Sequence, residues 1–459
     1  MTAAFPLAVS QHELPGPKPH PILGNIPDLR HSPNVFETWT RLNMQYGDVV
    51  YLRVGPLKMF VVRNPDIIQH VLQKNNRNYW KGRQLKVIEP LVGKGLLTSE
   101  GDFWRRQRRL AQPAFHRRQI AALAQTMIDS ADHMLDRWES LAASGQRFDA
   151  AAAMMRLTLD IVSRTLFSSA LTRRELDRVA ETFTPVLEET NRRSQRIFHF
   201  WDRLPTRRNR AYRRGIASLE QTVYDIIARR RASGEEKDDL LGMLMAARDE
   251  QTNQFMDDKQ LRDEAMTIFL AGHETTAVTL SWALALLSRH PDVREKLFHE
   301  VDTVLQGRKP TPESAQQLAY TRMVIDETMR LYPPAVAVVR EAYAGDVLGD
   351  FPIEGGAQVV INIHGVHRHP DFWENPEGFQ PERFTPQAQK NRHKYAYLPF
   401  SAGPRVCIGN HFALMEATLI LAMIAQRYQV DLVPPYTLEP RMTLTLRPAK
   451  GVPVVLRRR

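Results

Sequence analysis

Apolar side chains recur at helical spacing along most of the chain between about residues 100 and 330. One segment in this region, from Glu264 to Arg289, is apolar on nearly every side, and His290–Pro291 ends it. A helix that is hydrophobic all round belongs in a large protein core or in a membrane. His273 and Glu274 lie in its middle, and buried charge in lipid is costly, so we expect a core helix.

Strand-like runs lie on both sides of this helical region. They cover residues 48–54, 58–62, 347–353, 358–366, 442–446 and 452–456. Gly55–Pro56 divides the first two runs and Gly355–Gly356 divides the next two, so we expect two hairpins. Asn64 and Pro65 then supply the cap and the first residue of a helix. The pattern predicts a single, mainly α domain over residues 1–459, with small β-sheets at its margins.

The composition is that of a globular protein with a large core, since 43% of the 459 residues are hydrophobic and 25% are charged. Basic residues outnumber acidic ones by 62 to 51, which gives a net charge of +11. Nucleic acid is one interpretation of the arginine clusters, but no binding motif accompanies them. Solvated helix faces are therefore favoured, and we expect no nucleic-acid partner. A basic surface also suits an acidic electron-transfer protein.

Cys407 is the only cysteine. It excludes an internal disulfide, a cysteine-ligated iron–sulfur cluster and a multi-cysteine zinc site built from this chain alone. Such cysteine usage is typical of a reducing compartment. The first nine residues have no basic segment and are too short and proline-broken for a membrane anchor. We therefore expect a cytoplasmic protein without a membrane anchor.

The segment Phe400–Gly409 surrounds this cysteine with glycines and a proline, and a helix-forming run follows it. A cysteine just before a helix N-terminus is stabilised as a thiolate by the helix dipole and the free N–H groups. Arg405 adds a fixed cation with several donors. A buried, unreactive cysteine and a catalytic thiol paired with histidine are alternatives. A thiolate beside an anion-binding arginine suits an iron porphyrin.

The order F-x-x-G-x-R-x-C-x-G in this segment resembles the haem-binding loop of the cytochrome P-450 family. In that family a cysteine thiolate holds the haem iron. The resemblance implies the P-450 fold, haem b (iron protoporphyrin IX) as cofactor and Cys407 as the metal ligand. It further implies that Arg405 binds a haem propionate and that Phe400 packs beside the sulfur. Other family motifs follow in the right order over essentially the whole chain.

The central helix carries the second motif, Ala271–Gly272–His273–Glu274–Thr275. Gly272 inside a helix costs about 1 kcal/mol relative to alanine, so its presence needs a reason. The segment resembles the A-G-x-[DE]-T motif of the family, which implies an oxygen-binding groove at Ala271 and Gly272. Glu274 and Thr275 would then relay protons for cleavage of the O–O bond. A structurally paired carboxylate and a threonine bonded to its own helix are the alternative.

Three more residues match haem-propionate positions of the family. Trp104 and Arg108 form a W-x-x-x-R pair on one face of a helix. Arg340 matches a further position, less specifically. An amphipathic helix with a buried tryptophan and exposed arginines explains the first two residues equally well.

The pattern E-x-x-R occurs at Glu327 and Arg330, and Arg383 lies in the sequence P-E-R-F at residues 381–384. Alone, such a pair is common on solvated helix faces. The resemblance implies that these three residues form a buried ionic network behind the haem loop, with a structural role. Removal of one member would leave a buried charge without its partner.

The sequence indicates the residues of the substrate pocket less clearly than those of the haem site. Leu97, Phe269 and Val336 are candidate lining residues, although each fits a plain core equally well. Their apolar character suggests a hydrophobic substrate such as a fatty acid, terpenoid or polyketide. Residues 197–214 are interpreted as a lid between two helices.

The resemblance implies a haem-thiolate monooxygenase that uses O2 and two electrons. No reductase sequence follows the haem loop, so electrons would come from a separate ferredoxin or flavodoxin with its reductase, and NAD(P)H would act only indirectly. A peroxide-driven peroxygenase and a non-catalytic haem or ligand-binding protein are alternatives. The pair Glu274 and Thr275 disfavours both, and a peroxide-driven route has less need of a proton relay.

Overall fold

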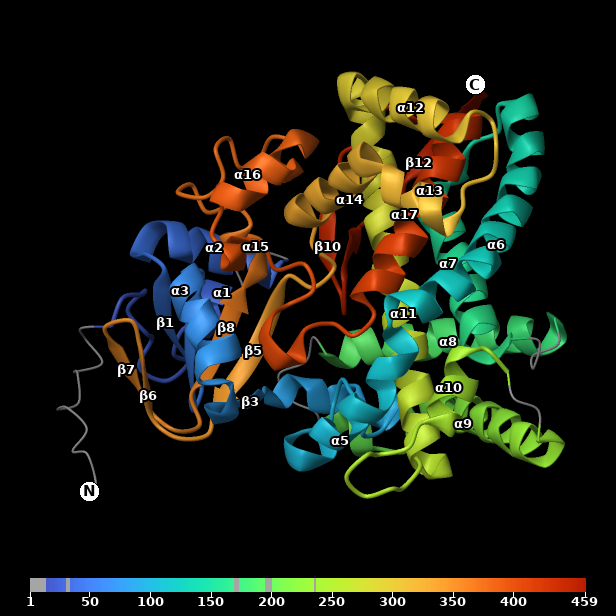
Figure 1. The fold of residues 1–459 in the computed structure, drawn as a ribbon. Coiled ribbons are helices and arrows are strands. Elements are labelled where there is room, and N and C mark those ends of the chain that lie inside the picture. Colours follow the sequence, from blue (N-terminus) through green and yellow to red (C-terminus); the bar gives the residue numbers. More distant parts are fainter. Residues whose placement is uncertain (1–13, 30–33, 169–172, 195–199, 235–236) are drawn as a thin grey trace. The chain divides into compact units, whose positions relative to one another are not determined.

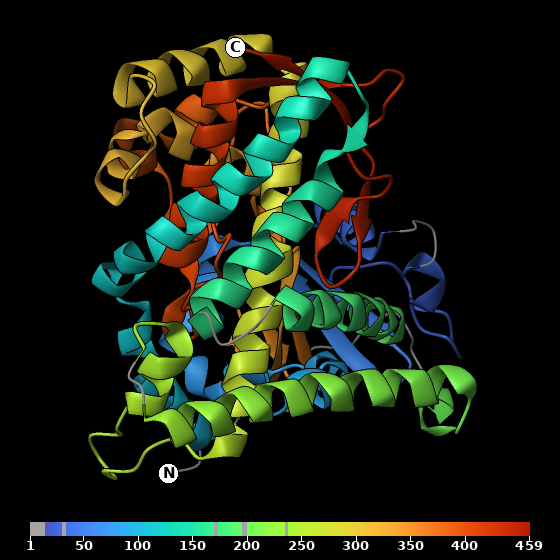
Figure 2. The same cartoon turned by 90° about the vertical axis from the view of Figure 1, so that its right-hand side faces the viewer.

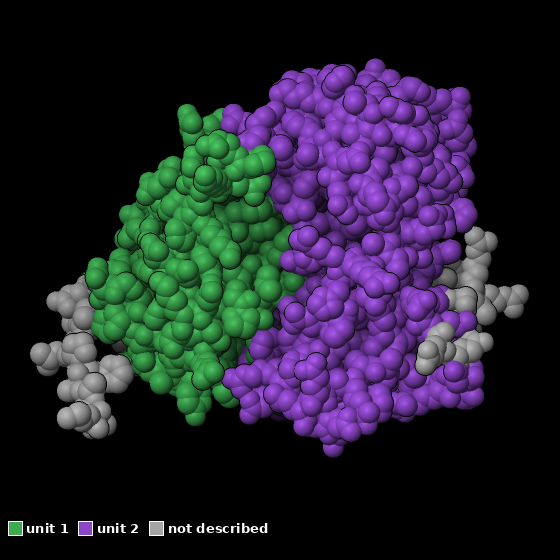
Figure 3. All heavy atoms as spheres, in the orientation of Figure 1, with its two compact units in different colours: residues 1–83, 329–378, 386–407 green, residues 84–328, 379–385, 408–459 purple. Residues whose placement is uncertain are grey.

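The computed structural model describes residues 14–29, 34–168, 173–194, 200–234 and 237–459. The extreme N-terminus and residues 197–199 of the expected lid lie outside these ranges. The chain forms two compact units (Figure 3). Unit 1 comprises residues 1–83, 329–378 and 386–407, and unit 2 comprises residues 84–328, 379–385 and 408–459.

Unit 1 is built on a five-stranded sheet with the order β1-β2-β8-β5-β3 (Figure 1). Its strands are β1 (Val49–Val54), β2 (Leu57–Val62), β3 (Tyr79–Lys81), β5 (Ala337–Ala342) and β8 (Gln358–Asn362), and a separate pair is β6 (Asp346–Leu348) and β7 (Phe351–Ile353). Its helical elements are α1 (Ile26–Leu29), α2 (Val35–Tyr46), α3 (Pro65–Gln69), η1 (His70–Lys74), η2 (Asn76–Asn78), α15 (Ile363–Val366), α16 (Pro386–Asn391), η8 (Lys394–Ala396) and η9 (Gly403–Arg405).

The first expected hairpin is confirmed, because β1 and β2 pair antiparallel from Val49 opposite Val62 to Val54 opposite Leu57. Gly55 makes the turn at a φ of 58°, which glycine adopts without strain. The helix start that follows is also confirmed. The Asn64 side chain accepts from the N–H groups of residues 66 and 67, and Pro65 is the first residue of α3.

The second expected hairpin is wrong. Residues 346–353 fold back on themselves as β6 and β7, with the turn at Gly349, whose φ is 62°. The strand β8 pairs antiparallel with β5 and parallel with β2. Every residue of β8 is buried, which is typical of a central strand covered on both faces. The sequence interpretation failed because strand pairing across long loops leaves no local signal.

Unit 2 contains most of the helices. They are α4 (Glu89–Val92), α5 (Gly101–Ala111), η4 (Gln112–Phe115), α6 (Arg117–Ser144), α7 (Ala150–Phe167), α8 (Arg173–Ser194), η6 (Phe200–Arg203), α9 (Arg207–Ser233), α10 (Leu240–Ala246), α11 (Asp258–Arg289), α12 (Pro291–Leu305), α13 (Pro312–Gln317), α14 (Ala319–Leu331), η7 (Pro381–Phe384) and α17 (Asn410–Arg427). Its strands are β4 (Phe148–Asp149), β9 (Tyr428–Leu432), β10 (Pro440–Met442), β11 (Leu446–Pro448) and β12 (Pro453–Arg458).

Helix α11 is the expected central helix, and it begins six residues before Glu264. The side chains of Asp257 and Gln260 form a capping box at its start. It ends at Arg289, and Pro291 is the first residue of α12, as the sequence predicts. The helices α7, α9 and α17 all pack against α11 (Figure 2). The mainly α fold class with small sheets is thereby confirmed.

Two small sheets complete unit 2, with the orders β4-β12-β9 and β10-β11. The expected strand at residues 452–456 corresponds to β12. The expected strand at residues 442–446 is wrong, since Met442 ends β10 and Leu446 begins β11. The residues between them form the turn of a hairpin, in which Thr443 N–H donates to the Thr445 carbonyl over 2.9 Å.

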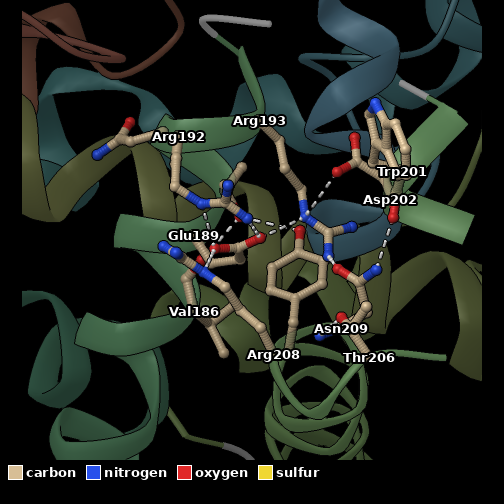
Figure 4. Close-up of polar contacts among 12 residues, drawn as sticks. Val186, Glu189, Arg192, Arg193, Trp201, Asp202, Thr206, Arg208 and Asn209 are labelled. Atoms are coloured by element: carbon tan, nitrogen blue, oxygen red, sulfur yellow. Dashed lines mark hydrogen bonds and ion pairs between the residues drawn. The ribbon is translucent and has the colours of Figure 1, made fainter. Parts of the chain in front are cut away.

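A polar cluster joins α8 to α9 (Figure 4). The buried carboxylate of Glu189 accepts from the Nε atoms of Arg192, Arg193 and Arg208 over 2.8, 3.0 and 2.5 Å. The Arg193 guanidinium also donates to Asn209 over 2.7 Å and lies 3.9 Å above the centre of the Tyr212 ring. Burial alone would raise the pKa of Glu189, but the three arginines outweigh it and lower the pKa to about 2.

We predict that Glu189→Gln lowers the free energy of unfolding at pH 7 by about 1–3 kcal/mol, because three cations lose their charged acceptor. The folded pKa is depressed, so this loss should be complete above the unfolded pKa near 4.5. It should shrink as the pH falls towards 2. Thermal unfolding of both proteins from pH 7 to pH 2.5 measures the difference.

Tyr212→Phe is the matched control, since it removes only the 2.9 Å hydrogen bond between the Tyr212 and Thr190 hydroxyls. It should cost about 1 kcal/mol at every pH below neutrality. A Glu189→Gln loss that stays constant down to pH 2.5 would contradict the assignment of the charge to Glu189.

Candidate active site

The loop that carries Cys407 is held in unit 1 by backbone hydrogen bonds. The Cys407 N–H donates to the Phe400 carbonyl over 3.0 Å, and the Val406 N–H donates to the Gly403 carbonyl over 3.1 Å. The cysteine is exposed, whereas Phe400 and Arg405 are half-buried. An exposed cysteine therefore lies at the end of a loop that backbone hydrogen bonds close.

Gly403 explains part of the motif around the cysteine. Its φ is 69°, and a Cβ at this position would lie 1.9 Å from the Leu72 carbonyl oxygen of η1. Only glycine allows the cysteine loop to approach η1 this closely. The residue is thus required by packing, and the loop position depends on it.

The backbone before the loop is fixed by a buried neutral histidine. The Leu398 N–H donates to His367 Nε2 over 2.8 Å, and His367 Nδ1 lies 3.3 Å from the Arg330 carbonyl. Burial holds the pKa of His367 well below its ordinary value. Nε2 is then the acceptor and Nδ1–H the donor. Arg330 itself is fully buried and donates to the carbonyls of His367, Pro376 and Gly378 over 3.0, 2.6 and 2.8 Å.

Arg340 lies on β5, opposite Val359 of β8, in the same unit as Cys407. Its side chain is buried, with a hydrogen bond from Nη1 to the Val339 carbonyl over 3.1 Å. Val336 is buried just before this strand, and its carbonyl accepts from the His364 N–H over 3.0 Å.

In unit 2, α11 presents one open face in an otherwise buried stretch. From Leu261 to Leu287 every residue is buried except Ala271, Gly272 and Thr275. Ala271 and Thr275 are four residues apart and share one face, and Gly272 lies beside them on the same turn. The Thr275 hydroxyl donates to the Ala271 carbonyl over 2.7 Å. A Cβ on Gly272 would lie 3.1 Å from Val162 Cγ2, so the glycine also allows α7 to pack closely.

Glu274 faces away from this open side. Its Oε1 accepts from the Thr445 hydroxyl over 2.6 Å, and the carboxyl is almost completely buried. Burial raises the pKa of Glu274, and the Thr445 hydroxyl offsets this rise in part. The described residues show no hydrogen bond between Glu274 and Thr275. Thr445 is a partner that the sequence interpretation missed, because its segment was expected to be a strand.

Trp104 and Arg108 lie one turn apart on α5, and both are half-buried. Two neighbouring arginines have other roles, since Arg106 and Arg109 pair with the buried carboxylate of Asp249 at 3.3 and 3.2 Å. Arg106 and Arg109 thus connect α5 to the loop before α11, whereas Arg108 does not belong to this pair of arginines.

The segment with Leu97 is attached to α11 by two carboxylates that the sequence interpretation also missed. The Lys94 N–H donates to Asp263 Oδ2 over 2.9 Å, and the Leu96 N–H donates to Glu264 Oε2 over 3.0 Å. Glycines precede both contacts, and a Cβ on Gly95 would lie 2.1 Å from the Thr267 hydroxyl oxygen. Leu97 is half-buried and its position follows from these contacts.

Phe269 is buried against two aromatic rings, with ring centres 6.5 Å from Phe167 and 4.9 Å from Phe183. It lines a cavity of about 10 Å³ together with side chains of α7, α8, α9 and α11. A cavity of this size holds about one water molecule.

Two members of the expected ionic network are in contact in unit 2. In unit 2, Glu327 is completely buried, accepts from the Gln380 N–H over 2.9 Å and pairs with Arg383 Nε at 3.3 Å. The structure thus brings Glu327 and Arg383 together. Arg330 is held by the three backbone carbonyls of unit 1 described above.

Each unit by itself carries groups whose chemistry suits an iron porphyrin. An exposed cysteine at the end of a closed loop offers a soft thiolate, the ligand type that suits iron. Arginine side chains and an indole N–H offer donors for carboxylates. The open face at Ala271, Gly272 and Thr275 offers a polar hydroxyl in an apolar helix.

Comparison with known families identifies the family of this chain, because the cytochrome P-450 family profile matches residues 14–454. The chain belongs to the cytochrome P-450 family. It is a P-450 monooxygenase and a haem-iron protein.

Relatives of this P-450 cover most of its length. The cyclooctat-9-en-7-ol 5-monooxygenase of Streptomyces melanosporofaciens is 36% identical over 422 residues, which are 90% of each chain. The pentalenene oxygenase of Streptomyces avermitilis is 34% identical over 396 residues, which are 86% of this chain and 87% of the relative. The crystal structure of the cytochrome P450DA heme domain has a TM-score of 0.88 and 29% identity, and covers 97% of this chain and 98% of that chain.

None of the helices in the described ranges of this P-450 combines the length and the apolar character that crossing a membrane requires.

We predict that Glu327→Gln lowers the free energy of unfolding by about 3–5 kcal/mol, because it leaves the nearly buried Arg383 without its carboxylate. Thermal unfolding measures the loss. The exposed pair of Lys296 and Glu382, at 2.6 Å, provides the control, and Lys296→Gln should cost far less, because water screens an exposed pair. Equal losses in the two variants would show that Glu327 carries no buried charge interaction.

Proposed function

We propose that this P-450 inserts one oxygen atom from O2 into a hydrophobic small molecule and receives its electrons from a separate carrier protein. The exposed Cys407 thiol on its closed loop is the observation that supports the proposal best. The bound group would be haem b, with Cys407 as the iron ligand. Trp104, Arg108, Arg340 and Arg405 would bind its propionates.

When bound, haem supplies the activation of O2, which the protein side chains cannot perform. The residues of the chain orient groups, exclude water and handle protons. Phe400 is half-buried in the cysteine loop and would shield the sulfur from water. Ala271 and Gly272 would leave room for oxygen on the open face of α11.

Thr275 would deliver protons through Oγ1, which now donates to the Ala271 carbonyl. Glu274 would hold a proton, because burial raises the pKa of its carboxyl. Transfer from Glu274 to Thr275 would require a water between them, or movement of the carboxyl away from Thr445.

A terpenoid-type substrate is the class we favour among fatty acids, terpenoids and polyketides. Two relatives are named for oxygenation of cyclooctat-9-en-7-ol and of pentalenene. The candidate lining residues Leu97, Phe269 and Val336 are all apolar, which suits such a molecule.

The electrons would come from a ferredoxin or flavodoxin with its reductase, and ultimately from NAD(P)H. The net charge of +11 would steer an acidic carrier to the surface. We place this chemistry in one catalytic domain that works in the cytoplasm, in keeping with the single cysteine.

The test is substrate turnover with NAD(P)H and a surrogate redox chain, compared with turnover on hydrogen peroxide alone. We predict product with the redox chain and little with peroxide. Thr275→Ala should keep NAD(P)H oxidation but divert most of it to peroxide, because the proton-delivering hydroxyl is lost.

Thr275→Ser is the control, since it keeps the hydroxyl and should stay coupled. Full coupling in Thr275→Ala would contradict the relay. Efficient turnover with peroxide alone would favour a peroxygenase, and no turnover in either assay despite bound haem would favour a non-catalytic haem protein.

A further inference from the structure

The contact between α11 and α17 contains polar groups that the described protein atoms do not satisfy. Glu416 on α17 is completely buried, and neither of its carboxyl oxygens has a hydrogen-bond partner. The hydroxyl of Thr276 on α11 is buried and also lacks one. Both residues belong to unit 2, and the sequence analysis assigned a role to neither.

Thr276 departs from the behaviour of the other hydroxyl side chains in this part of α11. The hydroxyls of Thr275, Thr279 and Ser281 each donate to the carbonyl four residues earlier, over 2.7, 3.0 and 2.6 Å. This is the usual arrangement for a hydroxyl inside a helix. Thr276 makes no such bond. Its hydroxyl instead lies close enough to the Glu416 carboxyl to lower the pKa of that group, although the contact does not have the geometry of a normal hydrogen bond.

The other elements packed against α17 bring no charged partner to Glu416. They are α6, α12, α13 and β9. Helix α13 has no buried side chain, and on β9 Tyr428 and Asp431 bond to Glu139 and Arg457. The buried side chains of α12 are all apolar, and the one polar buried side chain of α6, Ser130, donates to Asp160 over 2.7 Å. No charged group of the described residues acts on the Glu416 carboxyl. Burial therefore raises its pKa to about 8, with a small opposing effect of the Thr276 hydroxyl.

Buried polar atoms without protein partners are normally satisfied by ordered water. A buried water typically makes about three hydrogen bonds. The two oxygens of Glu416 and the hydroxyl of Thr276 supply three partners on facing helices. We propose that Glu416 and Thr276 bind an internal water, and that this bridge fixes the turn of α11 that carries Thr275.

Glu416 is then a positioning residue, which acts in its protonated, neutral form. Thr276 follows Thr275 directly, so a bridge from α17 to Thr276 restrains how far the open face of α11 can rotate. The inference rests on the proposed role of Thr275 in proton delivery. In this inference Glu416 transfers no proton, so it is not part of a second proton relay.

The experiment compares Glu416→Gln with Glu416→Leu in the haem-loaded protein. Glutamine is neutral and can bind the water, whereas leucine cannot. At pH 7 we expect Glu416→Gln to couple NAD(P)H oxidation to product like the unmodified protein, and Glu416→Leu to release several-fold more peroxide. Above pH 8 the unmodified protein should lose coupling as Glu416 ionises, and Glu416→Gln should keep it.

Two readouts do not depend on activity. The infrared carbonyl band of a protonated carboxylic acid should be present at pH 7, be absent in Glu416→Gln, and titrate away near pH 8. The unfolded carboxyl ionises near pH 4.5 and the folded one near 8, so unfolding releases a proton between these values. The thermal midpoint of the unmodified protein should therefore fall relative to Glu416→Gln as the pH rises through this window.

Thr276→Val and Thr276→Ser repeat the test from the other helix, in case Glu416→Leu fails to fold. Valine should uncouple turnover and serine should not. The proposal is overturned if Glu416→Gln uncouples at pH 7, if both Glu416→Leu and Thr276→Val stay coupled, or if the acid band is absent. A fully coupled Thr275→Ala would instead overturn the relay, and the infrared and unfolding results would still test the neutral, water-bound Glu416.

Discussion

The burial of α11 on nearly every side between Leu261 and Leu287 is the constraint on which unit 2 depends. A helix that is apolar on nearly every side must be covered on every side, and α7, α9 and α17 pack against it. The cost of leaving such a surface in water is large, because each buried leucine or phenylalanine contributes about 1.5–3 kcal/mol. The three residues that remain open, Ala271, Gly272 and Thr275, are therefore informative. They mark the one face of this stretch that a bound group could cover.

The polar side chains of α11 show how the same helix fixes its neighbours. Asp263 and Glu264 hold the backbone of the segment before Leu97, and Glu274 binds Thr445 in the turn between β10 and β11. All three are nearly completely buried, and they connect α11 to two different segments. In our account Thr276 adds a fourth connection, through water to Glu416. A substitution on any of these elements would thus change the position of the open face of α11.

Much of this could be predicted from the sequence where the signal is local. The C-terminal end of α11, the cap at Asn64 and the glycine-rich turn before Cys407 all follow from short-range rules of backbone geometry. The pairing of β8 with β2 and β5, and the Thr445 contact, could not be predicted, because each joins segments far apart in the chain. The burial of Glu416 could not be predicted either, since a glutamate in a helix-forming run is normally interpreted as a surface residue.

The central claim is that Cys407 binds haem iron as a thiolate. The most direct measurement is the absorption spectrum of the purified protein after reduction and addition of carbon monoxide. We predict a strongly red-shifted Soret band, which requires a thiolate ligand on the iron, and its loss in Cys407→Ser. A Soret band at the position of histidine-ligated haem in the unmodified protein, or a red-shifted band that survives in Cys407→Ser, would contradict it.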